Sequence, residues 1–137
     1  MKMTKDLFGV IIILLLLSGV FLFYSIRSLI TAINADLFHI IYSVNNPISD
    51  QINFFLTNII FIALFIVSIG LFTLKPMFRK FIIIIIAADI IHSLLFTKFS
   101  SENFYSDSLL LFFDVALSVF FMWFFCSKRI KNQFERL

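Results

Sequence analysis

Three ionisable side chains interrupt long apolar stretches of this sequence and are its main candidates for chemistry. Asp89 and His92 lie in one stretch at a spacing of i and i+3, which places them on one face of a helix, and Asp114 lies in the next stretch. A histidine beside a carboxylate titrates near physiological pH. The trio is therefore typical of a pH-sensitive or proton-relaying site.

Two other interpretations of Asp89, His92 and Asp114 stay open. Such side chains hydrogen-bond between helices, each bond contributing about 0.6–2 kcal/mol, and so fix how the helices pack. Alternatively, some of them face a second copy of the chain and form an oligomer interface or a narrow hydrophilic path. Because ionisable groups are costly within apolar segments, we keep all three as candidate site residues.

Metal binding and nucleophilic catalysis have little support in the residue pattern. His39 is distant in the sequence from His92, and no paired-histidine motif such as HExxH occurs. Ser93 follows His92, but consecutive helix residues point in different directions, and no GxSxG turn accompanies it. We therefore expect no catalytic residue, no bound metal and no cofactor.

The composition identifies the surroundings of these residues. Of the 137 residues, 61% are hydrophobic and 14% are charged, and the mean hydropathy is +1.07. Soluble domains have about 45–50% apolar and about 25% charged residues. The values exclude a cytosolic enzyme, a disordered linker and a nucleic-acid-binding module, and they predict an integral membrane protein. The single cysteine, Cys126, excludes an intramolecular disulfide framework.

Four apolar runs approach the length needed to cross a bilayer, which is about 20 residues for a core of about 30 Å. They lie at about 7–26, 52–74, 78–97 and 109–126. The third is the shortest, because its apolar part runs only from Phe81 to Phe96 and needs its flanking residues to reach across. The sequence predicts an all-α fold, in which residues 1–137 form a single four-helix membrane bundle.

The connection from Arg27 to Gln51 is long for a four-span bundle and has a pattern of its own. Ile, Leu and Val recur at helical spacing from Ile26 to Val44, with polar residues between them. The pattern predicts an amphipathic helix at the outer interface or a continuation of the first span. The alternative is a loop with scattered apolar residues, and Asn45–Pro47 then form a turn.

Basic residues predict the orientation, because cytoplasmic loops are enriched in Lys and Arg. Arg27 and Lys98 lie on one side of the predicted spans, against nine basic residues on the other. Both termini are therefore predicted to be cytoplasmic. The nine residues are Lys2, Lys5, Lys75, Arg79, Lys80, Lys128, Arg129, Lys131 and Arg136.

The rise per residue places several polar residues in one layer of the membrane. His92 lies roughly 9 Å and Asp114 roughly 8 Å from the outer boundary, on antiparallel helices, so we expect contact between them. Asn58 on the second span reaches a similar depth, and Arg27 lies near the outer end of the first. We predict one polar cluster of Asp89, His92, Asp114, Asn58 and Arg27, with Asp89 deepest.

The C-terminal tail, Ser127–Leu137, is basic and has Ile130, Phe134 and Leu137 at helical spacing. Anionic lipid is its simplest partner, at about 1 kcal/mol per basic residue near the surface, although orientation alone also explains the charge. A cytoplasmic protein is the alternative partner, and nucleic acid is not expected. The residues predicted to contact lipid or a partner are Lys75, Arg79, Lys80, Lys128, Arg129 and Lys131.

The chain resembles the YdgK-like family of small bacterial inner-membrane proteins, which have four spans. The resemblance rests on Ile26–Leu29 at the end of the first span, on Lys75–Lys80 after the second, and chiefly on Trp123 with Ser127–Asn132. It implies a multi-pass protein of the bacterial inner membrane. It implies no activity, because the function of that family is unknown.

These observations predict a non-enzymatic protein, since its cytoplasmic segments are too short for a catalytic domain. We expect a membrane anchor or sensor subunit that assembles with copies of itself or with a cytoplasmic effector, for instance in a defence or immunity system. One alternative is a small proton-coupled transporter or channel that uses Asp89, His92 and Asp114. The other is an immunity protein that blocks a pore-forming toxin inside the bilayer.

Overall fold

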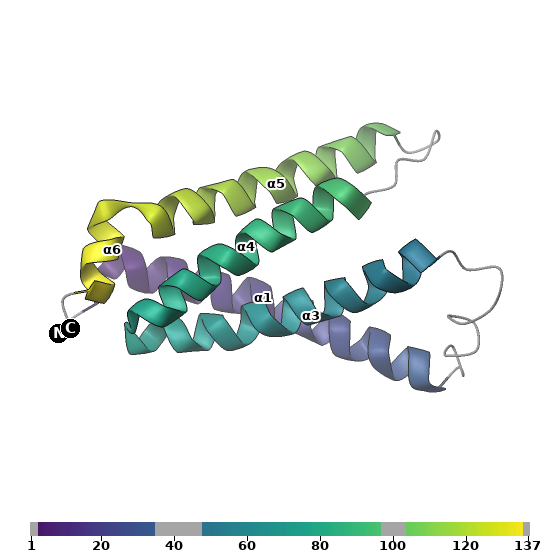
Figure 1. Ribbon diagram of the computed structural model, residues 1–137, viewed down its shortest axis with the longest axis horizontal. Helices are drawn as coiled ribbons and strands as arrows, with labels where there is room; N and C mark the ends of the chain where they lie inside the picture. Colours follow the sequence, from purple (N-terminus) through teal and green to yellow (C-terminus); the bar gives the residue numbers. More distant parts are fainter. Residues whose placement is uncertain (1–2, 35–47, 97–103, 136–137) are drawn as a thin grey trace.

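The computed structural model describes residues 3–34, 48–96 and 104–135, and the regular structure in these ranges is entirely helical. This confirms the predicted all-α class. Figure 1 shows four long helices and one short one. The helices are α1 (Lys5–Asn34), α3 (Ile48–Gly70), the 3-10 helix η1 (Leu71–Thr73), α4 (Pro76–Phe96), α5 (Phe104–Cys126) and α6 (Lys128–Glu135).

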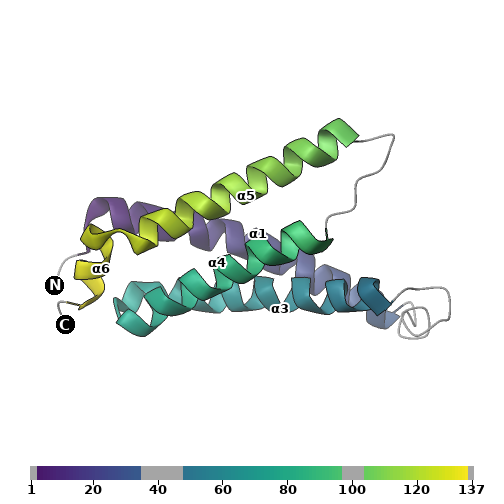
Figure 2. The ribbon, with the colours of Figure 1, turned by 45° about the horizontal axis from the view of Figure 1, so that its top comes forward.

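The long helices alternate in direction, so α6 returns to the end of the molecule where α1 begins (Figure 1). We call this end the closed end, and the end where α1 stops and α5 begins the open end. α1 packs against α3, α3 against α4, and α4 against α5. α1 and α5 lie close at the closed end and diverge toward the open end in both views (Figures 1 and 2).

Most of the buried apolar side chains gather at the closed end. Ile130 and Phe134 of α6 are 2% and 0% exposed, because this short helix folds back and packs against α4 and α5. Burial of such side chains stabilises by about 1.5–3 kcal/mol each. The core cluster comprises Leu7, Ile11, Leu14, Val67, Leu71, Leu74, Ile82, Ile86, Phe121, Phe125, Ile130 and Phe134.

A tight turn joins α3 to α4 at the closed end. The chain passes through η1 to Leu74, which adopts a left-handed conformation (φ 55°) and donates its N–H to the Leu71 carbonyl at 3.1 Å. Pro76 is the first residue of α4, where its missing N–H costs no helical hydrogen bond. Pro76 therefore opens α4.

Three helical segments are long and apolar enough to cross a membrane: Lys5–Thr31, Ile52–Thr73 and Tyr105–Cys126. They contain the first and fourth predicted spans, and all of the second except its last residue, Leu74. The third predicted span, 78–97, falls largely in α4, whose 21 residues include the charged Arg79, Lys80 and Asp89. The length of α4 matches a span, and its charges set it apart from the other three.

The connection between the first two spans is helical at both of its ends. α1 continues to Asn34, so the predicted continuation of the first span is the interpretation that holds for residues 27–34. α3 already begins at Ile48. The remainder of the predicted interfacial helix and the Asn45–Pro47 turn lie in 35–47, outside the described residues.

Candidate functional site

A hydrogen bond between two polar side chains joins α1 to α3. The Ser25 hydroxyl donates to the Asn58 side-chain oxygen, and both residues are buried. The Asn58 amide in turn donates to the Phe54 carbonyl at 2.7 Å, which holds the side chain in place. Asn58, a predicted site residue, therefore fastens two helices.

His92 joins α4 to α3 rather than to α5. Its Nε2 lies 2.7 Å from Asn53 Oδ1 and 3.3 Å from Thr57 Oγ1, and its ring packs beside Phe96 with a centroid separation of 5.1 Å. The predicted contact with Asp114 is therefore replaced by contacts with α3. The expectation of a contact rested on depth alone, and depth does not say which side of its helix a residue occupies.

Two carboxylates join α4 to α5, each through one serine. Ser118 of α5 donates to Asp89 Oδ2 at 3.3 Å, and Ser93 of α4 donates to Asp114 Oδ2 at 2.8 Å. Within the described part of the chain, each carboxylate accepts only this hydrogen bond. Since a carboxylate can accept about four, both Asp89 and Asp114 retain unused acceptor capacity.

Asp89 and Asp114 line one small cavity of about 50 Å³ where the four long helices meet. Leu14 and Leu17 of α1 and Leu64 of α3 are among the residues that line its other walls. A space of this size holds one or two water molecules. We call Asp89, Asp114 and the space between them the dicarboxylate cavity.

Two of the α5 residues that line the dicarboxylate cavity, Asp114 and Leu117, are exposed. Leu110, Asp114 and Leu117 share a face of α5 at a spacing of i, i+4 and i+7. Leu110 is 67% and Leu117 43% exposed, and Asp114 is exposed as well. Within the described residues, this face of α5 is therefore not covered by α1.

The five predicted cluster residues thus do not form one hydrogen-bonded network. Asn58, His92 and the two aspartates lie on three successive helix contacts, and Arg27 is exposed on α1. Sequence reasoning missed their partners Ser25, Asn53, Thr57 and Ser118. The available signal was that each is a hydrogen-bonding side chain inside an apolar run at a depth near that of its partner.

A larger polar-lined cavity, of about 510 Å³, lies between α1 and α3 toward the open end. Uncharged polar side chains and aromatic rings line it, including Tyr24, Ser28 and Asn53. Several of these polar groups already pair with each other or with backbone, as Ser25 does with Asn58. Tyr24 is the only ionisable side chain among the described residues that line this cavity.

Comparison with known proteins gives no further assignment. No protein family, curated protein or solved structure matches this chain. The resemblance to the YdgK-like family therefore stays a prediction. Within the described residues, no group of three or more His, Cys, Asp or Glu side chains is arranged to hold a metal ion.

Arg79 corrects one prediction at the closed end. It was predicted to contact lipid or a partner, but it is 7% exposed, and its Nη1 donates to the Phe125 carbonyl at 2.9 Å. Its Nη2 also lies 4.0 Å from Glu135 Oε1. The sequence could not show this, because the burial of Arg79 depends on α6 folding back against α4.

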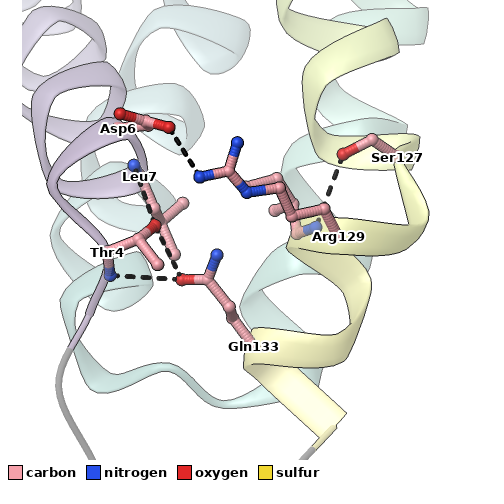
Figure 3. A network of polar contacts seen from close by, with 7 residues as sticks. Thr4, Asp6, Leu7, Ser127, Arg129 and Gln133 are labelled. Atoms are coloured by element: carbon pink, nitrogen blue, oxygen red, sulfur yellow. Dashed lines mark hydrogen bonds and ion pairs between the residues drawn. The ribbon is translucent and has the colours of Figure 1, made fainter.

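Polar contacts also tie the start of α1 to α6 (Figure 3). Arg129 Nη2 lies 2.8 Å from Asp6 Oδ2, and the Thr4 hydroxyl donates to Gln133 Oε1 at 3.1 Å. Ser127 caps α6, since its Oγ accepts the Ile130 N–H at 3.4 Å. The predicted amphipathic tail is therefore a helix whose apolar side is used within the molecule.

Proposed function

We propose that this chain is a non-enzymatic, multi-pass membrane protein that assembles with another membrane-spanning helix at the dicarboxylate cavity. In this proposal α1, α3, α4 and α5 all cross the bilayer, and both termini are cytoplasmic. The apolar lengths of α1, α3 and α5 support the crossings. The gathering of basic residues at the closed end supports the orientation.

The observation that carries the proposal is the incomplete hydrogen bonding of Asp89 and Asp114. An aspartate near the centre of a spanning helix costs about 2.5–3.5 kcal/mol on insertion scales, and such residues face a bundle interior or a water-filled space. Here each carboxylate has one serine donor among the described residues, and Asp114 is exposed. A helix placed against this side of α5 would supply the missing donors and cover the carboxylate.

The chemistry of the site indicates which kind of helix fits. Two carboxylates call for a partner that carries a basic, amide or hydroxyl side chain at the same depth. Asp114 lies about 18 Å from the closed end of α5, whereas the exposed Arg27 lies about 33 Å from the closed end of α1. A second copy in parallel orientation would not bring Arg27 to Asp114, so we favour a different protein over a second copy.

Site-specific photo-cross-linking in the membranes of the source cells tests this assembly. A photoreactive residue at Leu110 or Leu117 would face the incoming helix, whereas one at Leu16 or Ile66 would face lipid on α1 or α3. We expect a discrete protein adduct from the two α5 positions only. Asp114→Asn should lower its yield about tenfold, as expected when a charge-assisted hydrogen bond of about 1.5–3 kcal/mol is lost.

Each outcome of the cross-linking experiment decides something. An adduct of twice the mass of the chain would show that the partner is a second copy of this chain and not a different protein. Equal adducts from Leu110 and Ile66, or none from either α5 position, would contradict the assembly. The control positions are comparably exposed, since Leu16 is 66% and Ile66 58% exposed, so access to the reagent does not distinguish them.

A second candidate function is proton-coupled transport, favoured by one observation. Asp89 and Asp114 line the same cavity, so a proton on one carboxyl could pass to the other through a single water molecule. His92 would not take part, because it is hydrogen-bonded to α3. Liposomes containing the full chain should then carry a proton flux that Asp89→Asn and Asp114→Asn both abolish. Unchanged flux in the variants, or none in the wild type, removes this candidate.

A further inference from the structure

The closed end carries four lysines that form no ion pair within the described part of the chain. Lys5, Lys75, Lys80 and Lys128 are all exposed, and none has an ion-pair partner among the described residues. They come from α1, the turn before α4, α4 itself and α6. We call these four lysines the basic rim.

The neighbouring charges at this end are already engaged. Arg129 pairs with Asp6 at 2.8 Å and Lys131 with Glu135 at 3.8 Å. Arg79 is buried against the Phe125 carbonyl. Both described carboxylates at this end thus pair with cations outside the basic rim, and the four lysines of the rim stay exposed.

We propose that the basic rim binds the phosphate groups of anionic lipids in the leaflet that surrounds the closed end. The inference rests on the proposed function, because spanning helices would place the closed end at the level of the lipid headgroups. Juxtamembrane lysines attract anionic lipid. The four lysines sit on separate elements around this end, which suits several small headgroups better than one compact acidic peptide.

The packing of α6 determines how this binding must work. An amphipathic helix usually binds a membrane by burying its apolar side among acyl chains. Here Ile130 and Phe134 are buried inside the molecule, so that side of α6 is not available to lipid. Binding at the basic rim is therefore electrostatic. It must weaken steeply with salt, because the Debye length falls from about 10 Å at 0.1 M to about 3 Å at 1 M.

The test measures binding of a fluorescent short-chain phosphatidylglycerol to the purified full chain in neutral detergent micelles, with phosphatidylcholine as the reference lipid. We expect tighter binding of phosphatidylglycerol. Lys75→Gln with Lys128→Gln should weaken it about 30-fold, which corresponds to about 2 kcal/mol at tenfold per 1.4 kcal/mol. The control is Arg27→Gln, which removes an exposed basic residue about 33 Å from the closed end of α1 and should leave the affinity unchanged.

Three results would overturn the inference. They are equal affinity for the two lipids, an equal loss in the control variant, and binding that survives 1 M salt. Inorganic phosphate is included as a competitor, and if it displaces the lipid at equal concentration, the rim is a site for the free ion. The absence of lipid binding at the basic rim would not change the cross-linking result for α5, so the two proposals can be contradicted independently.

Discussion

Three buried polar side chains, Arg79, Ser25 and Asn58, form hydrogen bonds between helices. The Arg79 guanidinium reaches the Phe125 carbonyl, which belongs to the last turn of α5, where carbonyl groups lack helical partners. A cation at this position also opposes the negative end of the helix dipole. One side chain therefore fastens α4 to the end of α5.

Replacing Arg79 should accordingly destabilise the fold. Arg79→Met keeps the aliphatic bulk but removes the donor, and we expect the free energy of unfolding to fall by about 1.5–3 kcal/mol. Lys80→Met is the control, because Lys80 is exposed on the next position of α4 and should change stability by less than about 0.5 kcal/mol. Denaturation in mixed micelles measures both. Equal effects would show that the Phe125 contact contributes nothing.

The Ser25 and Asn58 pair allows a direct measurement of an interhelical hydrogen bond. A double-mutant cycle with Ser25→Ala and Asn58→Ala should give a coupling energy of about 0.6–1.7 kcal/mol, the range for such bonds in membranes. The same unfolding assay supplies the four free energies. If the changes in the free energy of unfolding of the two single variants add up to that of the double variant, the hydrogen bond contributes nothing to stability.

Sequence reasoning at this scale identified the residues but not their partners. Asp89, His92, Asp114 and Asn58 stood out because each is rare in an apolar run. Their partners Ser93, Ser118 and Thr57 are ordinary in such runs, so only their depth pointed to them. Counting residues along a helix gives the depth of a residue. The neighbour that its side chain faces depends on how the helices pack, which the sequence does not show.

At the scale of elements, the α3–α4 turn depends on a single glycine. A Cβ placed on Gly70 would overlap the ring of Phe78, so the two helices can approach only because position 70 has no side chain. At Gly9 on α1, by contrast, an added Cβ meets nothing within 4 Å. Two glycines in helices of one chain thus have opposite tolerance for substitution.

Gly70→Ala should therefore destabilise the turn, and Gly9→Ala should not. We expect the first to lower the free energy of unfolding by about 1–3 kcal/mol, as overpacking does, and the second to raise it by up to about 1 kcal/mol through better helix propensity. Thermal unfolding of the two variants side by side measures this difference. A Gly70→Ala variant as stable as Gly9→Ala would show that Phe78 moves aside freely.

The element scale also shows what patterning can and cannot predict. Runs of apolar residues gave the long helices, and the spacing of Ile130 and Phe134 gave α6. The packing of α6 against the closed end was not predictable, because the apolar side of such a helix can bury itself equally well in a membrane surface. The reach of α1 to Asn34 was one of two readings that the periodicity allowed.

For the whole molecule, the decisive question is whether α4 crosses the membrane. Cysteine labelling answers it, since Cys126→Ser leaves a chain without cysteine. If α4 crosses, Tyr105→Cys at the start of α5 and Asn132→Cys on α6 are labelled from opposite sides, and Met77→Cys is labelled from the same side as Asn132→Cys. If only α1, α3 and α5 cross, Tyr105→Cys and Met77→Cys share a side. An impermeant maleimide applied to intact cells and to lysed ones separates the two cases.

The ties between Thr4 and Gln133 and between Asp6 and Arg129 link positions that are 129 and 123 residues apart in the chain. During synthesis the first helix emerges long before the residues it must meet, so the closed end cannot form until α6 has been synthesised. Until then, the start of α1 lacks its final neighbours and depends on the insertion machinery or on lipid to shield it. Deleting α6, residues 128–135, should consequently produce a polypeptide that inserts normally but is cleared by quality-control proteases.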